Sequence, residues 1–188
     1  LYAWTIDGDE LFEIEDQGAS NSGLAVGDID GDGAPEIVWA TDHHLFAQRA
    51  DGTSVPGFAA SPTGKLLFRG APTLADLDGD GRLDILIGAQ DNRNGSHGHG
   101  KVYAFRYVDG RVKRAKGWPR ALKHFSSYAS PSIADLNGDG APEVIAESYD
   151  RLYVWTAKGR PFSSRFPAIL VSPITDAVLN SAGSFYSS

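Results

Sequence analysis

The apolar positions of the chain fall in short runs of Val, Ile, Leu and aromatic residues, which Gly, Pro, Asp and Asn interrupt. Examples are residues 36–41 (EIVWAT), 84–89 (DILIGA) and 143–148 (EVIAES). No run carries apolar residues at helical spacing over three turns. Short runs bounded by turn-forming residues are typical of strands. The pattern therefore predicts an all-β fold.

The runs recur as a repeat. Each copy reads as a strand, a tight Asp-rich loop, a second strand, a turn, an aromatic strand such as residues 152–156 (LYVWT), and a ragged fourth strand. Four short strands per repeat, at a period near 50 residues, are typical of β-propeller blades. The segments that align without gaps are residues 27–40 (GDIDGDGAPEIVWA), 75–88 (ADLDGDGRLDILIG) and 134–147 (ADLNGDGAPEVIAE).

The repeats divide the chain into blades, and the chain starts and stops within a blade. We expect it to be an excerpt of a larger ring of about seven or eight four-stranded blades with metal-binding hairpin loops. The predicted divisions are 1–19 (end of a preceding blade), 20–66 (repeat 1), 67–125 (repeat 2), 126–170 (repeat 3) and 171–188 (degenerate start of a further blade).

Each Asp-rich loop offers oxygen side chains at its positions 1, 3, 5 and 9 and a backbone carbonyl at position 7. Calcium takes about six to eight oxygen ligands, so such a loop supplies most of its coordination shell. Glycines at positions 4 and 6 permit the bend that brings alternate side chains together. We expect about three Ca²⁺ ions, one per loop. The predicted ligands are Asp28, Asp30, Asp32, Ala34 and Glu36; Asp76, Asp78, Asp80, Arg82 and Asp84; and Asp135, Asn137, Asp139, Ala141 and Glu143.

The net charge of −7 comes from these loops, because they hold 11 of the 24 acidic residues. The remaining 13 acids are outnumbered by 17 Lys and Arg. Cation sites explain this acidity, and it gives no support for a nucleic-acid partner, which calls for a clustered basic face. No apolar stretch approaches the roughly 18 residues of a membrane helix, so membrane insertion is not expected.

An EF-hand and an ordinary turn are the structural alternatives for these loops. An EF-hand begins similarly but needs a bidentate Glu at position 12 and flanking helices. Position 12 is Trp39, Ile87 or Ala146, each inside a β-like run, and Pro35 and Pro142 occupy position 8. An Asx turn is enough to account for a single Asp-Gly loop, but three matching copies favour metal binding.

The spacing resembles the FG-GAP or VCBS repeat family, the calcium-loop blades of integrin α-subunits, bacterial extracellular proteins and some lectins and polysaccharide lyases. Residues 72–84 and 131–143 carry its P-x-φ-A-D-φ-[DN]-G-D-G-x-x-[DE] pattern, where φ is apolar, whereas the first loop has Gly27 in place of Ala and no upstream Pro. The resemblance implies a propeller with structural calcium and an extracellular role. Extracellular modules bind calcium with Kd values of about 10⁻⁴ to 10⁻³ M, which also favours a secreted, cell-surface or periplasmic location.

For function, we expect a non-enzymatic binding or scaffold module that presents loops to a protein or glycan, as in cell adhesion or carbohydrate binding, with the remaining blades of the ring supplied by the same or another chain. No catalytic motif is present, which favours a non-enzymatic role, and an enzyme is kept as the alternative. One alternative is part of a polysaccharide lyase resembling rhamnogalacturonan lyases, and another is a non-catalytic module attached to a secreted enzyme. Bases that could hold an acidic polymer are Arg111, Lys113, Arg114, Lys116 and Arg120.

Overall fold

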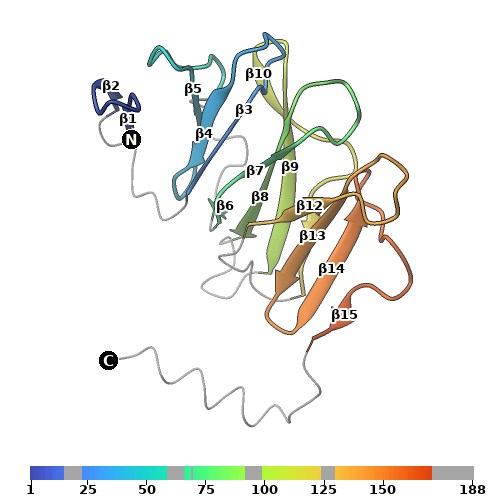
Figure 1. Cartoon of the computed structure of the whole chain (residues 1–188). Helices are drawn as coiled ribbons and strands as arrows, with labels where there is room; N and C mark the ends of the chain where they lie inside the picture. The colour runs from blue at the N-terminus through green and yellow to red at the C-terminus, as the bar shows by residue number, and fades with distance from the viewer. Residues whose placement is uncertain (15–22, 59–65, 69, 92–98, 124–129, 171–188) are drawn as a thin grey trace, which may run out of the picture.

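The computed structural model describes residues 1–14, 23–58, 66–68, 70–91, 99–123 and 130–170. Strands, turns and bends account for all the secondary structure in these ranges, and this confirms the all-β prediction. The strands form four antiparallel sheets that follow one another in chain order (Figure 1). No helix in the described ranges has the length and apolar character needed to span a membrane.

The first two sheets are a small hairpin and the three-stranded sheet of repeat 1. In repeat 1 the central strand pairs with both neighbours, and the hairpin that carries the Asp-rich loop is formed by the edge strand and the central strand. The strands are β1 (Tyr2–Trp4) and β2 (Glu10–Glu13) in the hairpin, and β3 (Leu24–Gly27), β4 (Glu36–Ala40) and β5 (Leu45–Gln48) in repeat 1.

Repeat 2 forms the largest sheet, with strand order β10-β9-β8-β6, while β7 pairs with β8 and β11 pairs with β9. Its two long strands, β8 and β9, run to either end of residues 91–100, most of which lie outside the described residues. The bounds are β6 (Leu66–Phe68), β7 (Thr73–Ala75), β8 (Asp84–Asp91), β9 (Gly100–Val108), β10 (Arg111–Arg114) and β11 (Arg120–Ala121).

Repeat 3 forms a four-stranded sheet in the simple order β12-β13-β14-β15. Its aromatic strand β14 pairs with the central strand over six residues, from Glu143↔Thr156 to Ser148↔Arg151. The bounds are β12 (Ser132–Ala134), β13 (Glu143–Ser148), β14 (Arg151–Thr156) and β15 (Ala168–Ile169).

The fourth strand differs between repeats. In repeat 3 it is the short β15, and in repeat 2 β10 and β11 share its place beside β9. In repeat 1 the described residues up to Phe58 contain no fourth strand; they make one isolated bridge, Gln48↔Ser54, and the backbone hydrogen bond from Val55 N to Ala47 O at 2.9 Å. Pro56 and Gly57 follow at once, and proline cannot donate to a sheet ladder.

Two apolar clusters join consecutive repeats. One contains residues of repeats 1 and 2, including Ile29 and Ile85, and the other contains residues of repeats 2 and 3, including Leu77 and Val144. Side chains alternate between the faces of a strand, so each central strand sends one set toward the preceding sheet and one toward the following sheet. The sheets therefore pack face to face in series, which explains why their central strands read as nearly continuous apolar runs.

A close backbone contact also repeats where one sheet meets the next. Gly117 lies against the turn of repeat 3, so a Cβ added to it would be 2.2 Å from the carbonyl oxygen of Lys158. Gly57 lies equally close to the turn of repeat 2, where an added Cβ would be 2.3 Å from the carbonyl oxygen of Gly110. The next side chain then packs on the following sheet, as Trp118 does by donating from Nε1 to Ala157 O at 3.0 Å. Glycine is required at both contacts because any side chain would collide with backbone.

Candidate metal sites

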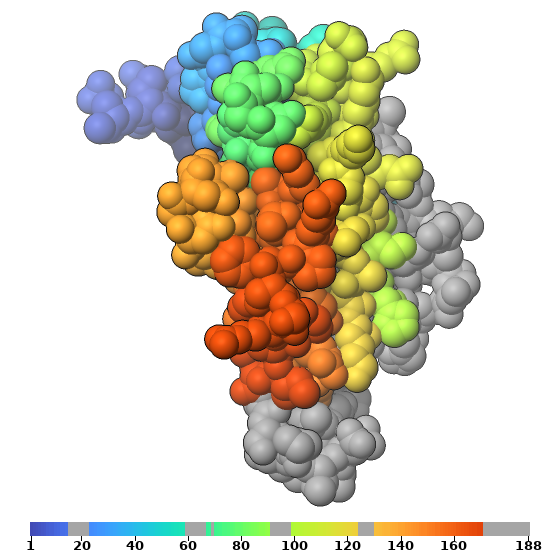
Figure 2. Space-filling view, turned by 90° about the vertical axis from the view of Figure 1, so that its right-hand side faces the viewer, coloured from blue at the N-terminus to red at the C-terminus, as the bar shows by residue number. Residues whose placement is uncertain are grey.

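The three Asp-rich loops each close the hairpin between the first two main strands of a repeat. Loop 1 (residues 28–36) connects β3 to β4, loop 2 (76–84) connects β7 to β8, and loop 3 (135–143) connects β12 to β13. Figure 2 shows the blue, green and light orange segments that carry these loops following one another along one face of the molecule. The repeat predicted from sequence therefore recurs as a repeat of the loops in space.

Position 1 organises each loop through its carboxylate. In loop 1, Asp28 accepts hydrogen bonds from the backbone N–H groups of Gly31 at 2.6 Å and Gly33 at 2.9 Å. Both glycines have positive φ, 83° and 89°, which side-chain-bearing residues rarely adopt. The same two bonds, from positions 4 and 6 to position 1, are made by Asp76 in loop 2 and Asp135 in loop 3.

Position 9 is the first residue of the central strand, and it is buried in every loop. Glu36 is 0%, Asp84 4% and Glu143 2% exposed. Each carboxylate accepts a hydrogen bond from the backbone N–H at position 2: Ile29 to Glu36 at 3.1 Å, Leu77 to Asp84 at 3.2 Å and Leu136 to Glu143 at 2.9 Å. Strand pairing and burial thus hold the ninth residue with its carboxylate directed back into the loop.

The second oxygen of Glu36 has no hydrogen-bond partner although it is buried. Burial is the main cause that raises the pKa of Glu36 above its ordinary value; the bond from Ile29 lowers it, and Asp30, Asp32 and Asp28 raise it further. A buried carboxylate oxygen without a partner is costly. Loop 1 therefore contains an oxygen that a bound cation would satisfy.

Two of the loops bring carboxylates close enough together to hold a metal ion. In loop 1 the group is Asp28, Asp30 and Glu36, and in loop 2 it is Asp76, Asp78 and Asp80, with ligand oxygens within 4.8 Å of one another. Carboxylate oxygens suit hard divalent cations such as calcium and magnesium. These two acidic groups fit a metal ion of that kind.

Loop 3 repeats the hydrogen bonds but has no such group within the described ranges. Its position 3 is Asn137, whose amide donates to Asp139 Oδ2 at 3.0 Å. The pKa of Asp135 lies below its ordinary value, mainly because the backbone N–H of Gly140 bonds to the carboxylate. An amide oxygen also binds calcium, so the ligand roles assigned to loop 3 remain predictions.

The position-7 residues, Ala34, Arg82 and Ala141, donate their backbone N–H groups to the position-5 carboxylates at 2.8 to 2.9 Å. These bonds orient Asp32, Asp80 and Asp139 in the same way. The position-7 carbonyls as metal ligands remain predictions.

Arginines enter the first two loops, and motif spacing alone did not indicate them. Arg49, just after β5, places Nη2 3.2 Å from Asp30 Oδ2. Arg106 of β9 forms ion pairs with Asp78 and, through Nε at 3.0 Å from Oδ1, with Asp84. In the sequence, each arginine stands at or next to the end of the aromatic strand, at the position that lies opposite position 9. This position is recognised only once the strand register is known.

The electrostatics of loop 2 reflect these arginines. Burial raises the pKa of Asp84 to about 6, and the nearby Arg106 guanidinium opposes the shift. Arg82 at position 7 donates to Asp80 Oδ2 at 2.6 Å, and this side-chain bond is the main cause that lowers the pKa of Asp80. Loop 2 is thus the loop in which positive side chains contact the carboxylates most extensively among the described residues.

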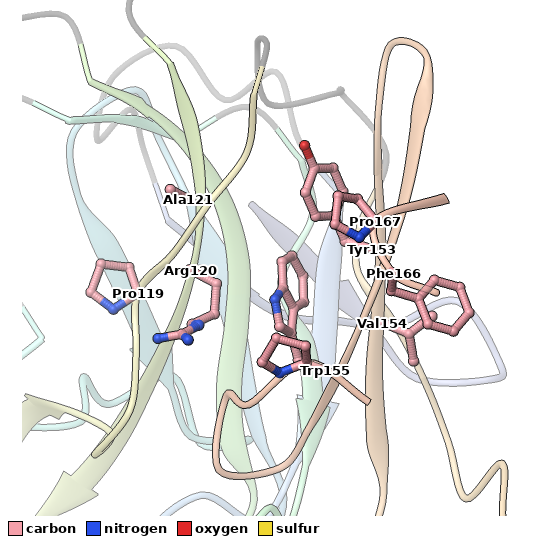
Figure 3. A pocket seen from close by; sticks show the side chains of 9 residues that line it. Pro119, Arg120, Ala121, Tyr153, Val154, Trp155, Phe166 and Pro167 are labelled. Carbon is pink, nitrogen blue, oxygen red and sulfur yellow. The ribbon is translucent and has the colours of Figure 1, made fainter. Parts of the chain in front are cut away.

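Two cavities lie beside the sheets. One, of about 410 Å³, lies between β11 and β14; Figure 3 shows Tyr153 and Trp155 on the side of β14 that faces Arg120, with Val154 and Phe166 on the other side. Tyr153 and Trp155 are each 6% exposed, so they pack in the core. The other cavity, of about 710 Å³, separates loops 2 and 3, with Lys158 and Arg160 at its edge.

The FG-GAP-like repeat matches the sequence twice, over residues 28–87 and 76–146, which together cover more than half of the chain. The chain belongs to the FG-GAP-like repeat family. Both matches begin at position 1 of a loop, Asp28 and Asp76, and end in the central strand of the next repeat, so the first match contains loops 1 and 2 and the second contains loops 2 and 3.

No curated protein matches this FG-GAP-like chain. Among solved structures it is similar to Bacillus licheniformis rhamnogalacturonan lyase PL11, at 15% identity and a TM-score of 0.35, over 87% of this chain and 44% of that one. It is also similar to the V. cholerae biofilm matrix protein Bap1, at 20% identity and a TM-score of 0.34, over 83% of this chain and 30% of that one. The chain thus spans less than half the length of either structure.

Proposed function

We propose that the chain is a calcium-stabilised segment of an extracellular β-propeller, in which each repeat is a blade and the loops present a binding surface to a protein or glycan. The buried Glu36 carboxylate carries the proposal, because one oxygen has a backbone partner and the other has none. With Asp28 and Asp30 it forms an oxygen-rich site. A hard divalent cation supplies the missing partner and neutralises charge that would otherwise repel.

Calcium fits the donor set better than a transition metal. The ligand groups are carboxylates, an amide and the proposed carbonyls, and the chain contains no cysteine. Nitrogen and sulfur ligands suit zinc and copper, whereas calcium takes oxygen ligands in flexible geometry. The proposed ligands are the fifteen residues at loop positions 1, 3, 5, 7 and 9 named above, with one ion per loop.

The proposed role of calcium is to hold each hairpin in shape. The second residue of loops 1 and 2 packs between sheets: Ile29 and Leu77 are 0% and 5% exposed. An ion that fixes positions 1, 3, 5 and 9 therefore also fixes the position-2 side chain in the interface. At the calcium Kd of extracellular modules, about 10⁻⁴ to 10⁻³ M, the loops fill outside a cell and remain empty in the cytosol, which supports an extracellular location.

Two apolar faces at the ends of the series support further blades of the same ring as partners. Leu136, at position 2 of loop 3, is 49% exposed, whereas its counterparts Ile29 and Leu77 are buried against the next sheet. Val26 in β3 is 57% exposed, whereas its counterpart Leu74 in β7 packs against the preceding sheet. These faces are the two halves of one repeated interface, and we propose that blades from the same or another chain cover them.

Thermal unfolding with and without calcium tests the proposal. The chain is dialysed against chelator and melted at about 0 and 2 mM CaCl₂, with an equal concentration of MgCl₂ as the matched control for divalent charge. Calcium is expected to raise the melting midpoint and magnesium much less, because magnesium demands a tighter octahedral site. An unchanged midpoint in calcium would refute the metal role.

The exposed bases of β10 favour one second candidate function. Arg111, Lys113 and Arg114 are exposed on this strand, and such a row can hold an acidic polymer. Incubation with pectic polysaccharides, monitored by absorbance of unsaturated products, tests lyase activity. If unsaturated product forms with the unaltered chain and no longer forms when the three bases are replaced by Gln, the chain is an enzyme and the proposed binding role is wrong.

A further inference from the structure

The strand that follows the central strand places one side chain opposite position 9 of each loop, and this side chain differs between repeats. In repeat 3, Glu143 pairs with Thr156. Arg49 and Arg106 occupy the corresponding position in repeats 1 and 2. Arg49 follows Gln48, which pairs with Ile37, and Arg106 follows Phe105, which pairs with Ile85. Two arginines and a threonine therefore face three otherwise similar loops.

Arg106 contacts two proposed calcium ligands at once. Its Nη1 pairs with Asp78 at position 3, and its Nε lies 3.0 Å from Asp84 Oδ1 at position 9. The Asp84 side chain is 5% and the Arg106 side chain 28% exposed. Water screens such a pair less than a surface ion pair. The guanidinium therefore forms ion pairs with two ligand carboxylates from opposite ends of the loop, although its Nε–H makes no hydrogen bond.

Within the described residues, the other two loops lack this double contact. Arg49 contacts Asp30 alone, so Glu36 remains part of the acidic group of loop 1. Asp84, in contrast, is not part of the acidic group of loop 2. Across the described ranges, no Lys or Arg lies within ion-pair distance of the loop 3 carboxylates.

The formal charge of each loop, counted with the arginines that contact it, also differs between the repeats. Loop 1 has four carboxylates and one contacting arginine, a formal charge of −3. Loop 2 has four carboxylates and two contacting arginines, Arg82 and Arg106, a formal charge of −2. Loop 3 has three carboxylates and, in the part of the chain that the structure describes, no contacting arginine, a formal charge of −3. Because the charge of the ligand set tunes calcium affinity, loop 2 is expected to have the lowest calcium affinity of the three.

We propose that Arg106 is a built-in counter-cation of loop 2, which calcium must displace, so that loop 2 fills only after loops 1 and 3. The inference rests on the calcium role proposed above. A guanidinium bridges positions 3 and 9 with a single charge and a fixed planar geometry. Calcium brings two charges and a larger coordination shell, so it replaces the arginine once its concentration is high enough. The chain then responds to calcium in two steps.

Amide NMR signals of the position-6 glycines measure the three loops separately. Gly33, Gly81 and Gly140 each donate to the position-1 carboxylate of their own loop, so each signal reports local calcium binding. In a titration of the full chain with CaCl₂, the Gly81 midpoint is expected at a calcium concentration about tenfold or more above those of Gly33 and Gly140.

Two variants remove the guanidinium, and one control removes an equal charge nearby. Arg106→Thr copies the residue of repeat 3, and Arg106→Gln keeps more of the side-chain length if Arg106→Thr folds poorly. Lys113 lies opposite Arg106 in the β9–β10 pairing and contacts Asp109 instead of a loop, so Lys113→Thr is the matched control. Either Arg106 variant is expected to bring the Gly81 midpoint to within about threefold of the other two, whereas Lys113→Thr leaves the difference in place.

Failure of this inference is distinguishable from failure of the calcium role. If Gly33 and Gly140 respond to millimolar calcium and Gly81 responds with the same midpoint, the calcium role stands and the role of Arg106 is refuted. A delay at Gly81 that survives both Arg106 variants also refutes it. If none of the three glycines responds, both proposals are wrong.

Discussion

Glu36 accepts a hydrogen bond from the backbone N–H of Ile29 at 3.1 Å, across the full width of loop 1. Ile29 is 0% exposed and belongs to the apolar cluster between repeats 1 and 2. One interaction thus links a candidate metal ligand to the packing between sheets. The same bond recurs from Leu77 to Asp84 and from Leu136 to Glu143. Leu77 is also buried between sheets whereas Leu136 is exposed, so metal binding and sheet packing are expected to be coupled in the first two repeats.

Calcium is expected to stabilise the chain measurably. With a Kd of about 10⁻⁴ to 10⁻³ M and roughly 2 mM free calcium, each filled site adds about 0.7 to 1.8 kcal/mol to the free energy of unfolding. Two filled sites then raise the melting midpoint by about 3 to 14 °C for a domain of this size. Calorimetry over a range of calcium concentrations checks this, and a midpoint that does not depend on calcium concentration contradicts it.

Replacing Glu36 with glutamine separates the metal role from the structural role of this side chain. The amide oxygen of Glu36→Gln can still accept from Ile29, and the substitution removes a buried charge, so the calcium-free protein is expected to lose less than about 1 kcal/mol of stability. Calcium binding to loop 1 is expected to weaken about tenfold or more, because one charged ligand is lost. Isothermal titration calorimetry measures the affinity, and thermal melts in chelator measure the stability.

The control for this variant is Glu147→Gln, an exposed carboxylate on β13 outside the loops. It removes the same charge and leaves all proposed ligands intact, so calcium affinity is expected to stay within about twofold of the original. Equal effects of the two variants would show that general charge governs binding, without a specific site in loop 1.

The position-2 leucines test the packing between sheets. Leu77 is 5% and Leu136 49% exposed, although both occupy the same place in their loops. Leu77→Ala is expected to reduce the free energy of unfolding by about 2 to 4 kcal/mol, whereas Leu136→Ala costs less than about 1 kcal/mol. Urea unfolding followed by tryptophan fluorescence measures both. Similar losses would indicate that the face carrying Leu136 is already covered within the chain.

Gly117 provides a test of the contact between the second and third sheets. Gly117→Ala places a Cβ 2.2 Å from the carbonyl oxygen of Lys158 and requires an alanine at φ 90°. Gly8→Ala imposes a similar φ of 91° but meets no atom within 4 Å, so it controls for the backbone conformation. We expect a loss of about 1 kcal/mol for Gly8→Ala and about 3 kcal/mol or more for Gly117→Ala. Equal losses would contradict the close approach of the sheets.

The local sequence predicted the loops well because their geometry depends on residues a few positions apart. The bonds from Gly31 and Gly33 to Asp28 span three and five residues, and short apolar runs bounded by turn-forming residues predicted the strands. The FG-GAP-like repeat was identified from the same local pattern. Contacts within one loop can therefore be read from spacing.

Features that depend on pairing between distant segments could not be predicted in the same way. Arg106 reaches Asp84 from 22 positions along the chain, and only the register of β8 with β9 brings them together. The contact of Phe58 with Tyr107 of the next sheet, with ring centroids 5.3 Å apart, likewise depends on the packing of one sheet on another. The short β6 was not expected, because so few residues give little periodicity.

Introducing an arginine into repeat 3 provides the converse of removing Arg106. Thr156 lies directly opposite Glu143, so the guanidinium of Thr156→Arg can reach the carboxylates of loop 3, as Arg106 does in loop 2. The calcium midpoint reported by Gly140 is expected to rise about tenfold, while those of Gly33 and Gly81 change less than about twofold.

The control is Tyr149→Arg, which adds the same charge at the opposite end of the β13–β14 hairpin, where Tyr149 is 61% exposed. This control is expected to leave all three midpoints nearly unchanged. An unchanged Gly140 midpoint in Thr156→Arg would mean that an arginine at this strand position does not compete with calcium, and that the weakness of loop 2 has to come from Arg82 or from the shorter side chain of Asp84.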